Sequence, residues 1–95
     1  MYAAIRHYHF KKDEVENLDQ MVQEILMPLL KKVQGFVSYY WIDTGEGEGA
    51  SLSVFEDKAG ADESINVAAK FIKEHLADSV MQKTEIIEGP VKANS

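Results

Sequence analysis

The sequence of 95 residues contains no cysteine. Disulfides, thiolate zinc sites, iron–sulfur clusters and cysteine nucleophiles are therefore all excluded. Basic residues are also scarce, because 10 Lys and Arg stand against 16 Asp and Glu, which gives a formal net charge of −6. Binding to a phosphate backbone depends on clustered Lys and Arg, so nucleic acid is not an expected partner.

Long apolar runs are absent as well. The longest uncharged ones are Ile25–Leu30 and Phe36–Ile42, far short of the roughly 20 residues that span a bilayer. The first ten residues do not resemble a signal peptide, so we expect a cytoplasmic location and no membrane partner. The composition, 45% apolar and 27% charged, is that of an ordinary globular chain with one modest core.

The first half of the chain predicts a strand followed by a long helix. Residues 2–10 are rich in aromatic and β-branched types, which favour a strand. Asp13 has the capping-box spacing to Glu16, and Pro28 should disturb the helix near its middle. A helical stripe with steps of three and four residues follows Asp13 and ends before Gly35; its members are Val15, Leu18, Val22, Ile25, Leu26, Leu29 and Val33.

The second half predicts a hairpin, a second helix and a last strand. Residues 36–42 and 50–56 read as strands around a glycine-rich turn at 43–49. Asp57 or Asp62 caps a helix that ends near Ser79. Its apolar stripe comprises Ala61, Ile65, Ala68, Ala69, Ile72 and Leu76. Residues 84–91 form the last strand, at an edge or a bulge because they contain Gly and Pro.

The element order β-α-β-β-α-β predicts an α+β, ferredoxin-like domain over residues 1–91, followed by a tail at 92–95. Two split β-α-β units give a four-stranded antiparallel sheet with both helices on one face. We expect several of Tyr39, Tyr40, Trp41 and Phe55 on the uncovered face. So large an apolar patch is rarely left in water, so we expect a homodimer that encloses a shared space between two sheets.

Three segments resemble the antibiotic biosynthesis monooxygenase (ABM) superfamily of dimeric α/β barrels: GFVSYYWIDTG, ASLSVFEDKAGADES and the closing EIIEGPV. The resemblance covers nearly the whole chain. It implies a small, often cofactor-independent oxygenase, or a haem-degrading relative, with a ligand cavity between the sheet and the helices. The haem-degrading branch would require an Asn on the first strand and a Trp ten residues before His75. The first strand has no Asn, and Ile65 stands at the second position.

The alternation of side chains along the strands predicts which residues share a face. We expect the aliphatic Leu52 and Val54 to pack on the helices, together with Ile5. Ser51, Ser53 and Phe55 would then point toward the dimer space, as would Arg6 and Tyr8.

Several polar side chains are candidates for chemistry. A buried Arg6 must meet either a protein carboxylate or a bound anion. His75 lies at the edge of the second helix's apolar stripe and could reach a cavity. The candidate catalytic residues are Arg6, Tyr8 and His75. The candidate substrate-binding residues are Tyr40, Trp41, Ser53, Phe55 and Phe71.

His7 and His9 lie two residues apart on one strand face, a spacing that could chelate a metal. Two ligands need at least one further donor, and nothing in the sequence nominates one. We therefore expect structural histidines and no metal or other cofactor.

Two functions remain open. The first is a cofactor-independent monooxygenase that acts on an aromatic or quinone-like molecule. Such an enzyme needs fixed donors beside a substrate anion that passes an electron to oxygen. The second is a non-catalytic dimeric domain that binds a small ligand or provides an interaction surface. A cavity large enough for a ring system favours the first, and an interior filled by Leu, Ile and Phe favours the second.

Overall fold

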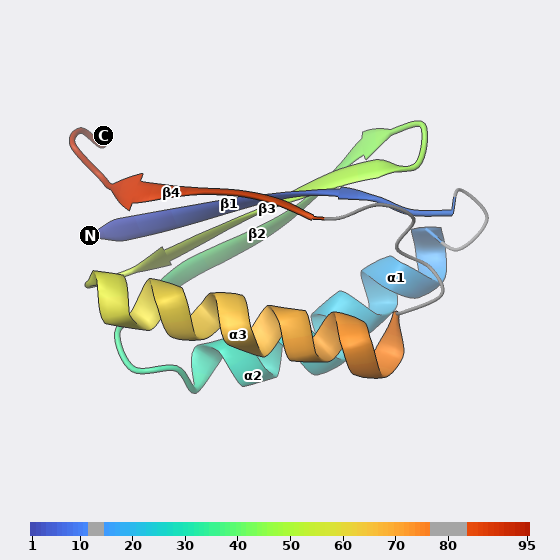
Figure 1. Ribbon diagram of the computed structural model, residues 1–95, viewed down its shortest axis with the longest axis horizontal. Coiled ribbons are helices and arrows are strands. Elements are labelled where there is room, and N and C mark those ends of the chain that lie inside the picture. Colours follow the sequence, from blue (N-terminus) through green and yellow to red (C-terminus); the bar gives the residue numbers. More distant parts are fainter. Residues whose placement is uncertain (12–14, 77–83) are drawn as a thin grey trace.

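The computed structural model describes residues 1–11, 15–76 and 84–95, with the side chains of residues 15 and 16 left aside. Figure 1 shows the elements in chain order. They are β1 (Tyr2–His9), α1 (Val15–Met21), the π-helical segment η2 (Val22–Leu26), α2 (Met27–Lys31), β2 (Phe36–Gly45), β3 (Glu48–Phe55), α3 (Lys58–His75) and β4 (Glu85–Pro90).

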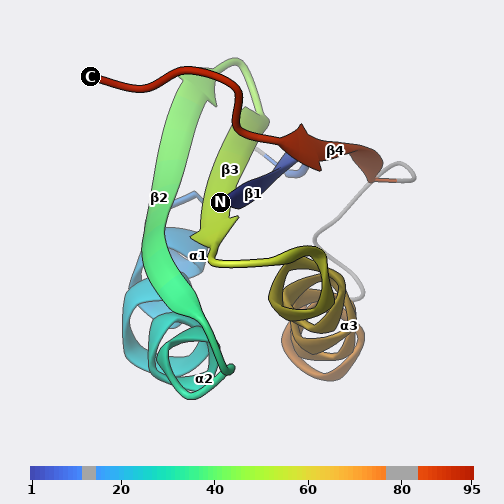
Figure 2. The ribbon, with the colours of Figure 1, turned by 90° about the vertical axis from the view of Figure 1, so that its left-hand side faces the viewer.

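The four strands form one antiparallel sheet in the order β2-β3-β1-β4. Figure 2 shows two layers, with the sheet on one side and all helical segments on the other. The predicted ferredoxin-like arrangement is thus confirmed, including the position of β4 at an edge, where Pro90 is tolerated. No helix in the described part of the chain is long and apolar enough to cross a membrane.

The first helix is continuous in space but changes its hydrogen-bonding pattern before Pro28. Met27 donates its backbone N–H to the carbonyl of Val22, five residues earlier, which is the π-helical spacing. Pro28 has no N–H to offer, and the predicted disturbance near Glu24 is therefore confirmed as a π-helical segment. Asp13, the expected cap, lies outside the described residues. Gly35 ends the unit with a left-handed φ of 84°, as predicted.

The hairpin is longer and its turn tighter than predicted. β2 extends to Gly45 and β3 begins at Glu48. Only Glu46 and Gly47 lie between the strands, and Gly45, Glu46 and Gly47 all have positive φ. Phe10 donates its N–H to the carbonyl of Gly47, which ties the end of β1 to this turn.

Helix α3 begins where the sequence indicates. Asp57 is the N-cap, because its carboxylate accepts a hydrogen bond of 3.0 Å from the N–H of Gly60. The helix buries mainly small residues, namely Gly60, Ala61, Ser64, Ala68 and Phe71. Ala69, which we expected in this stripe, is exposed. The described helix ends at His75, and its predicted end at Ser79 lies outside the described residues.

The predicted assignment of the sheet faces is wrong. Arg6, Tyr8, Ser51, Ser53 and Phe55 are all buried beneath the helices. Ile5, Leu52 and Val54 lie on the uncovered face instead, and Ile5 is 45% exposed. The physical reason is that α3 presents small side chains to the sheet, so small polar and aromatic residues fit under it better than a row of branched aliphatics.

The aromatic residues of β2 divide between the two faces. Tyr39 and Trp41 pack against the buried core, and Phe55 of β3 is completely buried. Tyr40 is 57% exposed on the uncovered face. The uncovered surface is therefore less aromatic and more aliphatic than expected.

Replacement of Gly60 by Ala should reduce the free energy of unfolding by roughly 1–3 kcal/mol, the usual range for overpacking. The added Cβ would lie 2.7 Å from the carbonyl oxygen of Gln34 and 2.9 Å from Cδ2 of Phe55. Urea denaturation measures the effect. Gly89→Ala is the control, because a Cβ there meets nothing within 4 Å. Equal stability of the two variants would contradict the close packing of α3.

Candidate functional site

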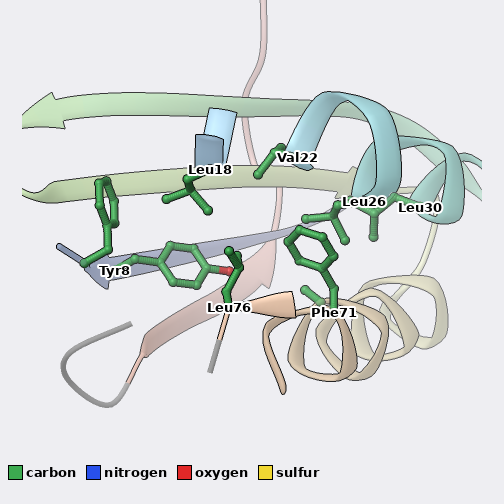
Figure 3. Packing of buried hydrophobic residues seen from close by; sticks show 9 residues of the cluster. Tyr8, Leu18, Val22, Leu26, Leu30, Phe71 and Leu76 are labelled. Atoms are coloured by element: carbon green, nitrogen blue, oxygen red, sulfur yellow. The ribbon is translucent and has the colours of Figure 1, made fainter. Parts of the chain in front are cut away.

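The space between the sheet and the helices contains a small aromatic cavity. Tyr8, Tyr39, Trp41 and Phe71 line it, together with aliphatic side chains of α1, η2 and the end of α3. Figure 3 shows the Tyr8 side chain projecting from β1 into this layer, with its hydroxyl beside Leu76. The cavity measures about 10 Å³, which is enough for roughly one water molecule.

Arg6 does not line this cavity, but it shares a strand face with Tyr8, which does, and it is only 3% exposed. Its Nε has no hydrogen-bond partner, and no carboxylate of the described residues forms an ion pair with it. The guanidinium carbon lies 5.7 Å from the centre of the Tyr8 ring. This cation–π contact contributes about 0.5–2 kcal/mol, whereas desolvation of an ion costs several kcal/mol. A protein carboxylate, one of the two partners expected for Arg6, is thus absent from its surroundings in the described part of the molecule.

The two phenols near Arg6 are held in their neutral form. Burial raises the pKa of Tyr8 above its ordinary value, although the Arg6 guanidinium acts in the opposite direction. Burial also raises the pKa of Tyr39, and the neighbouring Tyr8 adds to this rise. Both hydroxyl groups are therefore protonated at neutral pH and can donate a hydrogen bond to an anionic oxygen.

Ser51 adds a third hydroxyl to this polar group. Ser51 belongs to β3, and the strand register places it opposite Arg6 of β1 on one side and opposite Trp41 of β2 on the other. Its Oγ is buried, and it lies close enough to the hydroxyls of Tyr8 and Tyr39 to lower the pKa of both phenols, although burial outweighs this effect. This group consists of a guanidinium whose Nε has no hydrogen-bond partner among the described residues, one buried hydroxyl and two phenols. It is able to stabilise negative charge on a bound molecule.

Trp41 is fixed in position by a contact with the first helix. Its Nε1 donates a hydrogen bond of 2.7 Å to Oδ1 of Asp19. The Trp41 and Tyr8 rings meet edge to face, with centroids 5.5 Å apart. Because its N–H is satisfied, the indole offers an oriented apolar wall to the cavity.

The structure brings some of the predicted site residues together and separates others. Tyr8, Trp41 and Phe71 line the cavity, and Arg6 contacts the ring of Tyr8. Ser53 and Phe55 share their sheet face but do not line the cavity, since Phe55 packs against Phe36.

Tyr40 and His75 lie away from the cavity, so the structure does not bring them together with Tyr8 and Trp41. Tyr40 belongs to the opposite sheet face. His75 is exposed and lines a groove of about 480 Å³ between α2 and α3, with its ring 5.4 Å from that of Phe71.

Three residues of the site were not selected from the sequence, namely Tyr39, Ser51 and Asp19. The strand register signals the first two, because Ser51 lies between Arg6 and Trp41 across three strands. Tyr39 shares a face with Trp41, two residues away. Nothing in the sequence signals Asp19, since it meets Trp41 across 22 positions.

Replacement of Arg6 by Met should raise the free energy of unfolding by roughly 1–4 kcal/mol, because a buried charge gives way to an apolar side chain of similar length. Chemical denaturation of the two proteins provides the measurement. Arg6→Lys, which retains the charge, should give no such gain. A loss of more than about 3 kcal/mol in Arg6→Met, as for a broken buried ion pair, would show that the guanidinium is paired after all.

Comparisons with known proteins identify the fold. No protein-family model matches the sequence, and no curated protein does. Solved structures match over almost the whole chain. A protein of unknown function from Nitrosomonas europaea has a TM-score of 0.83 at 18% identity, covering 99% of this chain and 91% of that one. A putative antibiotic biosynthesis monooxygenase from the same organism has a TM-score of 0.81 at 10% identity, covering 98% and 100%.

A third match is a monooxygenase from Streptomyces coelicolor, from the gene ActVA-Orf6, solved in complex with the ligand nanaomycin D. Its TM-score is 0.78 at 11% identity, covering 99% of this chain and 89% of that one. Identities this low establish the architecture and leave the activity to be argued from the site. The chain has the ferredoxin-like fold of the antibiotic biosynthesis monooxygenase-like proteins.

Proposed function

We propose that this chain is a cofactor-independent monooxygenase that acts on a flat, weakly acidic aromatic molecule of the phenol or quinol type. The observation that carries the proposal is the buried Arg6 guanidinium, which has no carboxylate partner in the described chain and contacts the ring of Tyr8, a residue that lines the aromatic cavity. The similar monooxygenase from Streptomyces coelicolor, solved with a bound ligand, supports small-molecule chemistry in this fold.

The arrangement of charges suits an anionic intermediate. In its keto tautomer, a phenol of this type has an acidic CH₂ group conjugated with the ring carbonyl. Loss of a proton from this CH₂ group gives the phenolate, whose oxygen accepts hydrogen bonds from Arg6, Tyr8 and Tyr39. The electron-rich carbon reduces O₂ and forms a C–O bond. Loss of water then converts the CH₂ group into a carbonyl, so that one oxygen atom enters the product and the other leaves as water. O₂ is the only oxidant required.

Entry of a ring system requires more room than the cavity provides in this structure. A benzene ring fits a cavity of about 150 Å³, against about 10 Å³ here. Phe71, Ile72 and Leu76 line the cavity from the last turns of α3. A substrate must therefore displace these side chains. Its own apolar contacts with the cavity walls then replace the contacts that the displaced side chains made.

By the size criterion given for the two functions, a cavity of about 10 Å³ does not favour the monooxygenase. It favours the second candidate function, a non-catalytic dimeric domain that binds a small ligand or a partner surface. In that case Arg6 would hold an anionic ligand without turnover. A haem-degrading role is not proposed, because Ile65 occupies the position of the required Trp and His75 faces the outer groove.

We also propose that a second copy of the chain covers the open sheet face. One apolar side chain from each strand forms a continuous row across this face. The register pairs Ile87 with Ile5, Ile5 with Leu52, and Leu52 with Tyr40. Ile87 is 69% exposed and Ile5 is 45% exposed. Burial of such a row yields about 25 cal/mol for each Å² of apolar surface removed from water, which favours face-to-face pairing.

Oxidation of a phenol or quinol panel tests the proposed activity. The wild-type protein should consume O₂ with such a compound and transfer one labelled atom from ¹⁸O₂ to the product. Arg6→Met should lower kcat/KM by roughly 10²–10³, the usual loss when an oxyanion donor is removed. Lys73→Met is the control, because Lys73 is an exposed cation on α3.

Three outcomes of this experiment are informative. Equal turnover in Arg6→Met and the wild type would refute the role of the guanidinium. Ligand-induced thermal stabilisation without O₂ uptake would favour the non-catalytic candidate. If no compound of the panel stabilises the protein or causes O₂ uptake, both candidate functions are refuted.

Dimer formation is tested with two neighbouring residues of β4. Ile87→Lys places a charge in the apolar row and should convert the protein into a monomer in sedimentation experiments at micromolar concentration. Ile86→Lys is a matched control, because Ile86 lies opposite Arg6 on the helix side of the same strand and is 45% exposed. A monomeric wild-type protein, or equal dissociation of both variants, would contradict the proposed interface.

A further inference from the structure

We propose that His7, His9 and Glu48 form a binding site for a divalent transition metal ion such as Zn²⁺ on the open face of the sheet. This site lies on the face of β1 opposite to Arg6 and is separate from the proposed oxygenase site. The sequence alone led us to expect no metal, because it offered two histidines and no third ligand. The strand register supplies the third ligand.

The register places the donors together without any special loop. His7 and His9 are two residues apart on β1, so both project from the same face. Glu48, the first residue of β3, is the direct cross-strand partner of His9. All three side chains are partly exposed, with 38%, 25% and 40% of their surface accessible. An ion from solution can therefore reach them in the single chain.

Both distances from the Glu48 carboxylate to the histidine nitrogens are close to those that a small metal ion requires. Oε1 of Glu48 lies 3.6 Å from Nε2 of His7 and 3.3 Å from Nδ1 of His9. Zinc bonds of 2.0–2.1 Å in a tetrahedron place neighbouring ligand atoms about 3.4 Å apart. One ligand atom from each of the three residues lies within 4.8 Å of the other two.

Hydrogen bonds among the three residues explain these distances less well than a metal site does. A charge-assisted N–H···O bond is usually about 2.7–2.9 Å long, shorter than either of the two N···O distances. The histidine rings meet edge to face, with centroids 4.8 Å apart. Two imidazoles and one carboxylate form a ligand set of the kind that binds zinc, with a fourth position open to water.

A second carboxylate stands behind His7. The register pairs His7 with Glu85 of β4, and Oε1 of Glu85 lies 3.9 Å from Nδ1 of His7. Metal-bound histidines commonly donate their other ring N–H to a carboxylate, which fixes the tautomer and orients the ring. The Glu85 side chain is 72% exposed and has room to move closer. Glu48 and Glu85 together also offset the charge of a divalent cation.

Calorimetric titration with ZnCl₂ tests the proposal on the complete chain. The wild-type protein should bind one Zn²⁺ per chain. His9→Ala and Glu48→Gln should each weaken binding at least tenfold, because each removes one of three ligands. Glu85→Gln should weaken binding by about 10- to 100-fold, the usual effect of an outer carboxylate. Circular dichroism verifies that each variant is folded.

Two matched substitutions on α3 serve as controls. His75→Ala removes a histidine, and Glu74→Gln removes a carboxylate, both at exposed positions outside the cluster. Both variants should bind Zn²⁺ like the wild type. The monomeric Ile87→Lys protein should do so as well, because all ligands come from one chain. This result would separate the metal site from the dimer proposal.

Substitution of Co²⁺ for Zn²⁺ reports the geometry directly, because a tetrahedral site gives intense d–d absorption that an octahedral aqua ion lacks. Absence of Zn²⁺ binding at millimolar concentration would overturn the proposal. Unchanged affinity in Glu48→Gln or His9→Ala would overturn it equally, since the ion would then be held elsewhere.

Discussion

The alternation of side chains along β1 is the constraint on which both candidate sites depend. β1 is paired with β3 on one side and with β4 on the other, so its register cannot shift without loss of both ladders. A shift of one residue would move every side chain to the opposite face. Arg6 and Tyr8 are therefore held in the interior, while His7 and His9 are held on the open face. One strand thus separates an anion-stabilising group from a group of potential metal ligands.

The fold could be predicted from the sequence because its signals are local. A period of 3.6 residues, a left-handed Gly35 and the Asp57 cap mark the helices, and they act within a few residues of one another. The prediction of which sheet face is buried was wrong, because it depends on which of the two faces packs better against the helices. Ser51 and Ser53 are typical of exposed strand positions, but α3 presents Gly60 and other small residues to the sheet. A polar residue of small volume is then the better fit beneath the helix.

The candidate sites were predictable only in part, because their residues come from distant segments. Tyr8, Trp41 and Phe71 belong to apolar patterns that the sequence displays. The partnership of His9 with Glu48 depends on the register between β1 and β3, which no spacing along the chain encodes. The contact of Trp41 with Asp19 depends on how the first helix packs on the sheet. The place of His75 could not be predicted for a related reason, since the edge of a helical stripe faces either a core or a neighbouring groove.

The buried Arg6 guanidinium is the main support for the proposed function, because burial of a charge lowers the stability of the fold. Domains of this kind are stable by about 5–15 kcal/mol, and an unpaired buried cation consumes several kcal/mol of that margin. We propose that a bound anion offsets this cost, since Arg6 has no carboxylate partner among the described residues and contacts Tyr8, which lines an aromatic cavity. The histidines of the open face carry no such cost, because water solvates them. The proposal that these histidines bind a metal ion therefore rests on the convergence of their donor atoms with Glu48. The two sites can be tested independently.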